Sequence, residues 1–181
     1  MADAEHFLIE AVEDEYIQKI NSKARLSKFK VDSTLQKELK NYVIFGQANR
    51  KPFEPNKAED LRKLISEMER TQAYRDRITG ILIQARIAID ELEILKKSGA
   101  AFLYTQFAPE MKKCSNKETR DAAIHYVLDP IVRRQGQWES LLDIAELAKT
   151  NLNETYFALR EIGENGRKIL DARNVKRSFD A

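Results

Sequence analysis

Apolar residues recur about every 3.5 positions along residues 135–170. The members of one row lie seven apart: Trp138, Ala145, Leu152, Leu159 and Gly166. Leu142 and Tyr156 fill intervening positions, and a second row beside the first holds Leu141, Ala148, Ile162 and Ile169. This spacing predicts a helix that packs lengthwise against another helix. At 1.5 Å per residue such a helix is roughly 60 Å long, so a second long helix must run beside it.

Residues 56–98 form the one other segment long enough to be that partner. Asn56 with Glu59 resembles a capping box, and an apolar stripe follows at Leu61, Leu64, Ile65 and Met68. Residues 78–95 are apolar on nearly every side, which predicts cover on more than one face. Residues 100–107 cover part of this surface, and we expect another subunit of a homo-oligomer to cover the rest, with the N-terminal helix as the alternative. Lys96, Lys97 and Gly99 read as the last turn and stop of the helix.

Shorter helices are expected on either side of this pair. Residues 4–22 have the spacing of one amphipathic helix, and Asp32 or Ser33 can cap a second helix that ends near Phe45. Pro52 and Pro55 then interrupt the helical pattern, because proline is not tolerated inside a helix. Residues 100–107 read as a short, very apolar piece, and Ser115 with Glu118 predicts a capped helix through Leu128.

The last helix is expected to run from Pro130 to about Asn174, and residues 175–181 form a frayed basic tail. The predicted fold is all-α: an elongated helical bundle built on a long antiparallel helix pair, with shorter flanking helices. We expect one domain over residues 1–181, in which residues 1–50 are short helices, 56–98 and 130–174 the long pair, and 100–128 an end insert.

Composition agrees with long helices in a reducing compartment. Charged residues make up 33% of the 181-residue chain, with only 6 Gly and 4 Pro, which is typical of long helices. The net charge of +2 is too small to attract nucleic acid by itself, so such binding needs local patches. The chain has a single cysteine, and neither a secretory signal nor a membrane span is recognisable. These features favour a cytoplasmic protein.

No catalytic constellation stands out. His6 and His125 are isolated, and neither has a second ligand at metal-binding spacing. Phosphate loops, nucleophile elbows and dinucleotide fingerprints are missing from the sequence. We therefore expect no enzyme activity, no catalytic residues, no metal, no cofactor and no small-molecule substrate.

Basic residues beside aromatics form three patches, which is the pattern that single-stranded nucleic acid needs. The patches adjoin Phe29, Phe53 and Phe179. Their cations are the candidate nucleic-acid-binding residues: Lys23, Arg25, Lys28, Lys30, Arg50, Lys51, Lys176 and Arg177. Cations inside the long helices have acids at helical spacing, such as Lys63 with Glu67 and Lys168 with Glu164. The competing interpretation of each patch is a solvated loop beside a core aromatic.

The order of parts resembles the UvsY-type recombination mediators of tailed phages. The stretch F-K-V-D-S-T-L at residues 29–35 resembles the opening of a helix in that family. The stretches Q-W-E-S-L-L-D at 137–143 and F-A-L-R-E-I at 157–162 resemble its closing helix. The acidic first helix and the apolar insert at 100–107 depart from the family pattern. The resemblance implies a ring-shaped homo-oligomer that binds single-stranded DNA, displaces a single-strand-binding protein and loads a recombinase.

Two function hypotheses follow. The first is a non-enzymatic single-stranded-DNA-binding recombination mediator whose partners are single-stranded DNA and a recombinase. The second is a helical scaffold, adaptor or inhibitor protein that binds only protein partners. A viral protein is one example of this class. Oligonucleotide binding across a salt series separates the two, because only phosphate contacts give a steep salt dependence.

Overall fold

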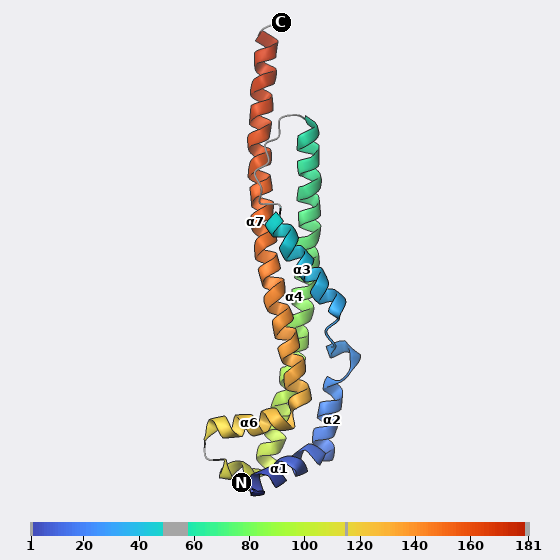
Figure 1. The fold of residues 1–181 in the computed structure, drawn as a ribbon, viewed down its shortest axis with the longest axis vertical. Coiled ribbons are helices and arrows are strands. Elements are labelled where there is room, and N and C mark those ends of the chain that lie inside the picture. Colours follow the sequence, from blue (N-terminus) through green and yellow to red (C-terminus); the bar gives the residue numbers. More distant parts are fainter. Residues whose placement is uncertain (1, 49–57, 115, 180–181) are drawn as a thin grey trace. The chain divides into compact units, whose positions relative to one another are not determined.

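The computed structural model describes residues 2–48, 58–114 and 116–179, and in this part of the chain every regular element is a helix (Figure 1). In chain order the elements are α1 (Ala2–Glu13), α2 (Glu15–Ala24), the 3₁₀ turn η1 (Ser27–Phe29), α3 (Ser33–Ala48), α4 (Ala58–Gln106), α5 (Ala108–Lys113), α6 (Lys117–Val127) and α7 (Asp129–Phe179). The predicted all-α fold is confirmed.

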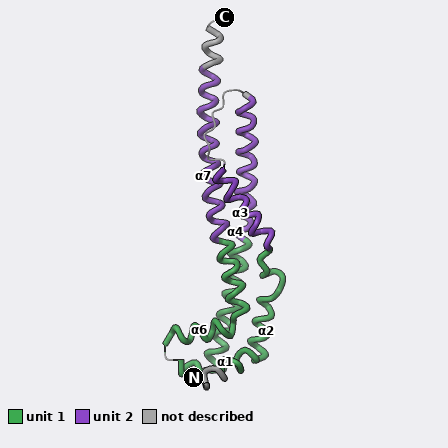
Figure 2. Tube along the Cα trace, viewed as in Figure 1, with its two compact units in different colours: residues 1–32, 84–142 green, residues 33–83, 143–181 purple. Residues whose placement is uncertain are grey.

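The chain divides into two compact units (Figure 2). Unit 1 comprises Met1–Asp32 and Gln84–Leu142, and unit 2 comprises Ser33–Ile83 and Asp143–Ala181. Helices α4 and α7 contribute to both units and pack together, with the shorter helices as flanks. The expectation of a single domain over residues 1–181 stays a prediction.

The two long helices run antiparallel in unit 2. Leu64 lies against Gly163, whereas Arg75, further along α4, bonds to Asn153, which lies earlier in α7. Earlier residues of α4 therefore meet later residues of α7. The predicted antiparallel helix pair is confirmed.

Seven-residue spacing dominates the buried faces of both long helices. In α7 the predicted row is buried as expected, and its intervening positions are the buried Leu141, Ala148 and Thr155. Leu142 and Tyr156, predicted to intervene, are only partly buried, and Ile169 is 47% exposed. In α4 the buried residues seven apart are Leu64, Thr71, Ile78, Ala85, Leu92 and Gly99. The row in α4 includes a threonine and a glycine, so hydrophobicity alone does not reveal its full length.

The first predicted helix is two helices. The break is at Asp14, whose Oδ1 accepts from the backbone N–H groups of Tyr16 (2.8 Å) and Ile17 (3.2 Å) and so caps α2. Apolar spacing continues across this break, because both helices bury one face inside unit 1. The buried residues include Phe7, Ala11, Ile17 and Ile20. The single-helix prediction was therefore wrong at the cap.

Helix α4 does not end at Gly99, as the sequence predicted, but continues through it to Gln106. A Cβ on Gly99 would lie 2.7 Å from Leu128 Cδ2 and 2.9 Å from Leu128 Cδ1. Gly99 is therefore small because the end of α6 packs directly on α4, not because the helix stops there. Residues 100–107, expected as a separate piece, belong almost entirely to α4.

Two further boundaries differ from the expectation. Asn116 caps α6, since its Oδ1 accepts from the Thr119 N–H at 2.8 Å, whereas Ser115 lies outside the described residues. Helix α7 continues through Phe179, so the residues from Val175 onward that were expected to fray are helical up to that point. The predicted cap at Asn56 and the prolines at 52 and 55 lie outside the described residues.

Helix α3 packs in unit 2 by a close approach of backbones. A Cβ on Gly46 would lie 3.0 Å from Asn151 Cβ and 3.2 Å from the Asn151 carbonyl carbon. The Gly46 carbonyl accepts from the Thr155 hydroxyl at 2.8 Å. A side chain at residue 46 would therefore press on α7 at Asn151. Helix α3 passes through Gly46 to Ala48 rather than stopping at Phe45.

Candidate nucleic-acid interface

Four of the eight predicted site residues lie in one described stretch of unit 1. Lys23 is in the last turn of α2, Arg25 is its C-cap, Lys28 is in η1 and Lys30 follows directly. All four side chains are exposed. Cations are favourable at a helix C-terminus, where the carbonyl dipoles point outward. We call this stretch, residues 23–30, the basic segment.

A buried anchor holds the basic segment on α7. The Trp138 indole Nε1 donates to the Phe29 backbone oxygen at 3.0 Å, and Trp138 is only 1% exposed. The ring of Phe29 is itself 2% exposed. The aromatic that the sequence placed in this patch therefore belongs to the core, and its faces cannot stack on a base.

Lys28 has partners of its own. Its Nζ forms an ion pair with Glu91 Oε2 and lies 4.6 Å from the centre of the Phe29 ring. Beside it, Lys23, Leu26, Ile94 and Leu95 help to line an open cavity of about 320 Å³. Both side chains of the ion pair are about half exposed, so water screens the pair and a phosphate can compete for the ammonium.

The structure brings together no more of the predicted site. Arg50 and Lys51 lie outside the described residues. Lys176 and Arg177 belong to the last turns of α7, but their side chains lie outside the described part of the chain. One of the three predicted patches can thus be examined in detail.

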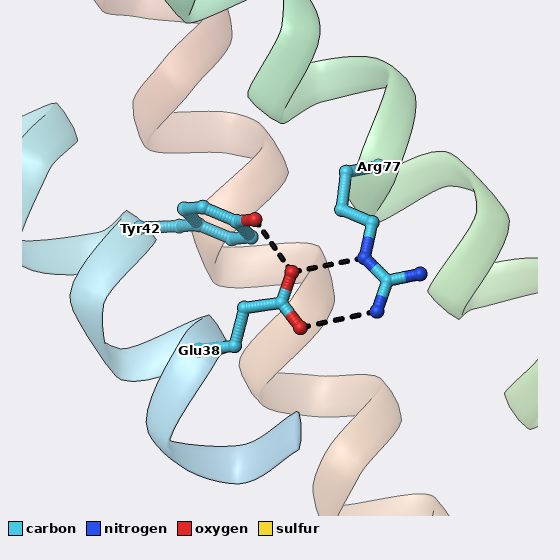
Figure 3. Close-up of polar contacts among 3 residues, drawn as sticks. All are labelled: Glu38, Tyr42 and Arg77. Atoms are coloured by element: carbon cyan, nitrogen blue, oxygen red, sulfur yellow. Dashed lines mark hydrogen bonds and ion pairs between the residues drawn. The ribbon is translucent and has the colours of Figure 1, made fainter. Parts of the chain in front are cut away.

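Unit 2 contains a polar cluster that the sequence did not point to (Figure 3). Arg77 of α4 donates to both carboxylate oxygens of Glu38 on α3, at 2.9 and 3.1 Å, and the Tyr42 hydroxyl donates to Glu38 Oε1 at 2.6 Å. The hydrogen bond from Arg77 lowers the pKa of Glu38 below its ordinary value. Burial, and then the neighbouring Glu38, raise the pKa of Tyr42 to about 12.

Aromatic rings continue this cluster along α3 and α4. Tyr74 lies 4.6 Å from the Tyr42 ring and 5.0 Å edge-on to the Phe45 ring, measured between centres. The guanidinium of Arg70 lies 4.9 Å from the centre of Phe45 and 5.5 Å from that of Tyr74. Because these rings already face one another and Arg70, the cluster attaches α3 to α4. The four-residue spacing of Arg70 and Tyr74 is a signal by which the sequence could have indicated this cluster.

Some cations on the long helices pair with acids four residues away, but among the described residues neither of the two predicted pairs is present. Lys63 pairs with Glu59 at 3.4 Å rather than with Glu67. Glu164 pairs with Arg160 at 3.0 Å rather than with Lys168. Either direction along a helix gives the same four-residue spacing, so sequence alone does not select the partner.

Within the described ranges, no three His, Cys, Asp or Glu side chains are grouped to hold a metal ion. None of the helices that are described is both long and apolar enough to cross a membrane. No family model, curated protein or solved structure matches the chain.

Proposed function

We propose that this chain is a non-enzymatic recombination mediator that binds single-stranded DNA through the basic segment and helps to load a recombinase. The observation that carries the proposal is the exposure of Lys23, Arg25, Lys28 and Lys30 on one segment that Trp138 anchors to α7. Exposed cations of this kind neutralise phosphates. The mediator role, the recombinase and the DNA rest on the resemblance to the UvsY-type family.

Phe29 is a core aromatic, as the competing interpretation expected, but the segment that carries the cations has a hydrogen-bonded backbone. The backbone of η1 is closed by hydrogen bonds from Phe29 to Leu26 (3.0 Å) and from Lys30 to Ser27 (3.0 Å). The buried side chain of Phe29 holds the segment against the core, and the cations lie on the exposed side of the segment. An ordered array loses less entropy when it binds a strand than a mobile loop does.

Fluorescence anisotropy with a labelled single-stranded oligonucleotide across a salt series tests the proposal. The wild type is expected to bind at low salt and to lose affinity steeply as salt rises. Replacing Lys28 and Lys30 by Ala should reduce the slope of log affinity against log salt by about one to two units for every sequence tested.

The matched control is Lys112→Ala with Lys113→Ala. These exposed lysines also belong to unit 1, so the control removes the same charge away from the basic segment. It should leave the slope within error of the wild type. Failure of the wild type to bind at low salt, or equal losses in the two double variants, overturns binding through this segment.

A protein-binding scaffold is the second candidate, because apolar side chains remain uncovered on α4. Ile87 is 55% and Ile94 63% exposed, and the two lie seven apart on one face. Exposed apolar rows of this kind are typical of helix–helix interfaces between chains. The predicted homo-oligomer would use the same face. Sedimentation at micromolar concentration tests it: Ile87→Gln with Ile94→Gln should lower the mass of an oligomer to that of the monomer.

A further inference from the structure

A second cavity of unit 1 shares one residue with the basic segment. It has a volume of about 400 Å³ and lies where α2 meets the junction of α6 and α7. Its walls include Asn21, Arg25, Tyr126, Asp129 and Arg133. Ligand sites commonly occupy about 300–1,000 Å³, so this cavity is large enough for one small planar group.

A buried amide builds the cavity. Asn21 is 8% exposed, and its Nδ2 donates to the Val127 backbone oxygen at 2.9 Å. That oxygen is one of the carbonyls at the end of α6 that have no donor within the helix itself. The bond fixes α2 on the end of α6, so Arg25 and Tyr126 face the same cavity although they come from distant parts of the sequence.

Tyr126 provides the exposed aromatic ring that the buried Phe29 does not. Its side chain is 58% exposed, whereas Phe29 is 2% exposed. An exposed ring presents a face on which any base can stack. Tyr126 is thus an accessible aromatic that shares a cavity with a cation of the basic segment.

Two guanidinium groups and one carboxylate set the charge of the cavity. Arg25 is exposed, and the Arg133 side chain is 77% exposed. Arg133 Nε pairs with Asp129 Oδ1 at 2.8 Å within the first turns of α7. A solvent-exposed pair four residues apart is weak, so a phosphate can recruit the guanidinium. Two cations against one carboxylate favour an anionic ligand.

We infer that this cavity binds a nucleobase of a single-stranded nucleic acid: Tyr126 stacks on the base, and Arg25 and Arg133 bind the flanking phosphates. The inference rests on the proposed function and names the residues that would contact a base. Arg25 belongs to both surfaces, so a strand bound along the basic segment continues into the cavity. Stacking recognises any base, which suits binding without sequence preference.

The test compares two fluorescent probes of equal length, an oligothymidylate and the same backbone with abasic sites. Tyr126→Leu keeps apolar bulk but removes the stacking face. It should weaken binding of the oligothymidylate about 5- to 150-fold and leave binding of the abasic probe unchanged. Tyr126→Phe keeps the ring and should bind both probes like the wild type. Arg25→Gln should weaken both probes and reduce the salt slope by about one unit.

Tyr104→Leu is the matched control, since Tyr104 is a 46% exposed tyrosine of unit 1 that does not line the cavity. It should bind both probes normally. If Tyr126→Leu also binds both probes normally while Lys28→Ala with Lys30→Ala weakens both, the base site is wrong and the proposed function stands. If the wild type binds neither probe at low salt, the proposed function fails and the base site fails with it.

Discussion

Each unit holds its shorter helices against its own part of α4 and α7, and the contacts differ between the two units. In unit 1 the flanking helices α1 and α2 bury apolar side chains that include Phe7, Ile17 and Ile20. The Phe7 ring lies 5.4 Å from the Phe107 ring, measured between centres. In unit 2 the 16-residue helix α3 buries only Leu39 and Gly46. Hydrogen bonds, ion pairs and ring contacts hold α3 instead.

The difference separates two means of attachment. Burial of apolar surface is non-directional and scales with area, so it tolerates small shifts in geometry. Hydrogen bonds to buried groups contribute little on average, but a partner left unsatisfied costs much more. Unit 1 should therefore be most sensitive to loss of volume, and unit 2 to loss of single polar atoms.

The largest expected effect is the loss of Trp138 from unit 1. Trp138→Ala should reduce the free energy of unfolding by about 3–5 kcal/mol, because it empties a buried site and leaves the Phe29 carbonyl without its donor. Urea denaturation followed by circular dichroism measures the change.

In the wild type the chain's one tryptophan should emit at short wavelength and resist iodide quenching. Emission typical of an exposed indole would contradict the register of the helix pair.

Next in size is the removal of one hydroxyl from unit 2. Thr155→Val keeps the shape of the side chain but leaves the Gly46 carbonyl unsatisfied, and should cost about 1–3 kcal/mol. Thr155→Ser retains the hydroxyl and should lose less stability. A loss in Thr155→Ser with no loss in Thr155→Val would show that the methyl group, and not the hydrogen bond, holds α3.

A smaller effect of opposite sign is expected at two open glycines, one in each unit. Gly80 and Gly136 are helical, and a Cβ on either would meet nothing within 4 Å. Gly80→Ala and Gly136→Ala should each raise the free energy of unfolding by about 0.5–1 kcal/mol, because alanine restricts the unfolded chain. Gly46→Ala is the contrasting variant in unit 2 and should destabilise, since the Asn151 backbone is in the way. A gain in stability at Gly46 would refute the close approach of α3.

The smallest effect concerns the Glu38 cluster and depends on pH. Arg77 lowers the pKa of Glu38, so the stability that the carboxylate contributes is present above its ordinary pKa and is lost as the pH falls through the folded value. Because the Arg77 side chain is 55% exposed, Glu38→Gln should cost less than about 1 kcal/mol at pH 7. The difference from the wild type, measured by urea denaturation, should shrink in acid. A difference that stays constant with pH would rule out the ion pair as its cause.

Tyr42 gives the alkaline counterpart. Its folded pKa of about 12 exceeds the ordinary value of 10.0, so its contribution is present below pH 10 and is lost as the pH rises through 12. The ultraviolet difference titration of the wild type against Tyr42→Phe should show one phenol that ionises near pH 12. Ionisation near pH 10 would mean that neither burial nor Glu38 acts on the hydroxyl.

Much of the fold could be predicted from the sequence because it depends on periodicity. The seven-residue rows of Trp138 and its partners fix which face of α7 is buried, whatever lies opposite. The same rule located the partner helix and the all-α class. The exposure of the cations in residues 23–30 could be predicted from their charge, since charged side chains rarely become buried.

Only the tertiary structure decided the contacts between segments that are distant in the chain. Gly99 has the sequence context of a helix stop, and its role as a packing surface for Leu128 becomes visible only when α6 is in place. Phe29 beside lysines reads as a stacking residue, yet it is buried beside Trp138, whereas Tyr126 is exposed and joins Arg25 in one cavity. Periodicity specifies which face of a helix is buried, but the partner of that face depends on chain reversals that local sequence does not encode.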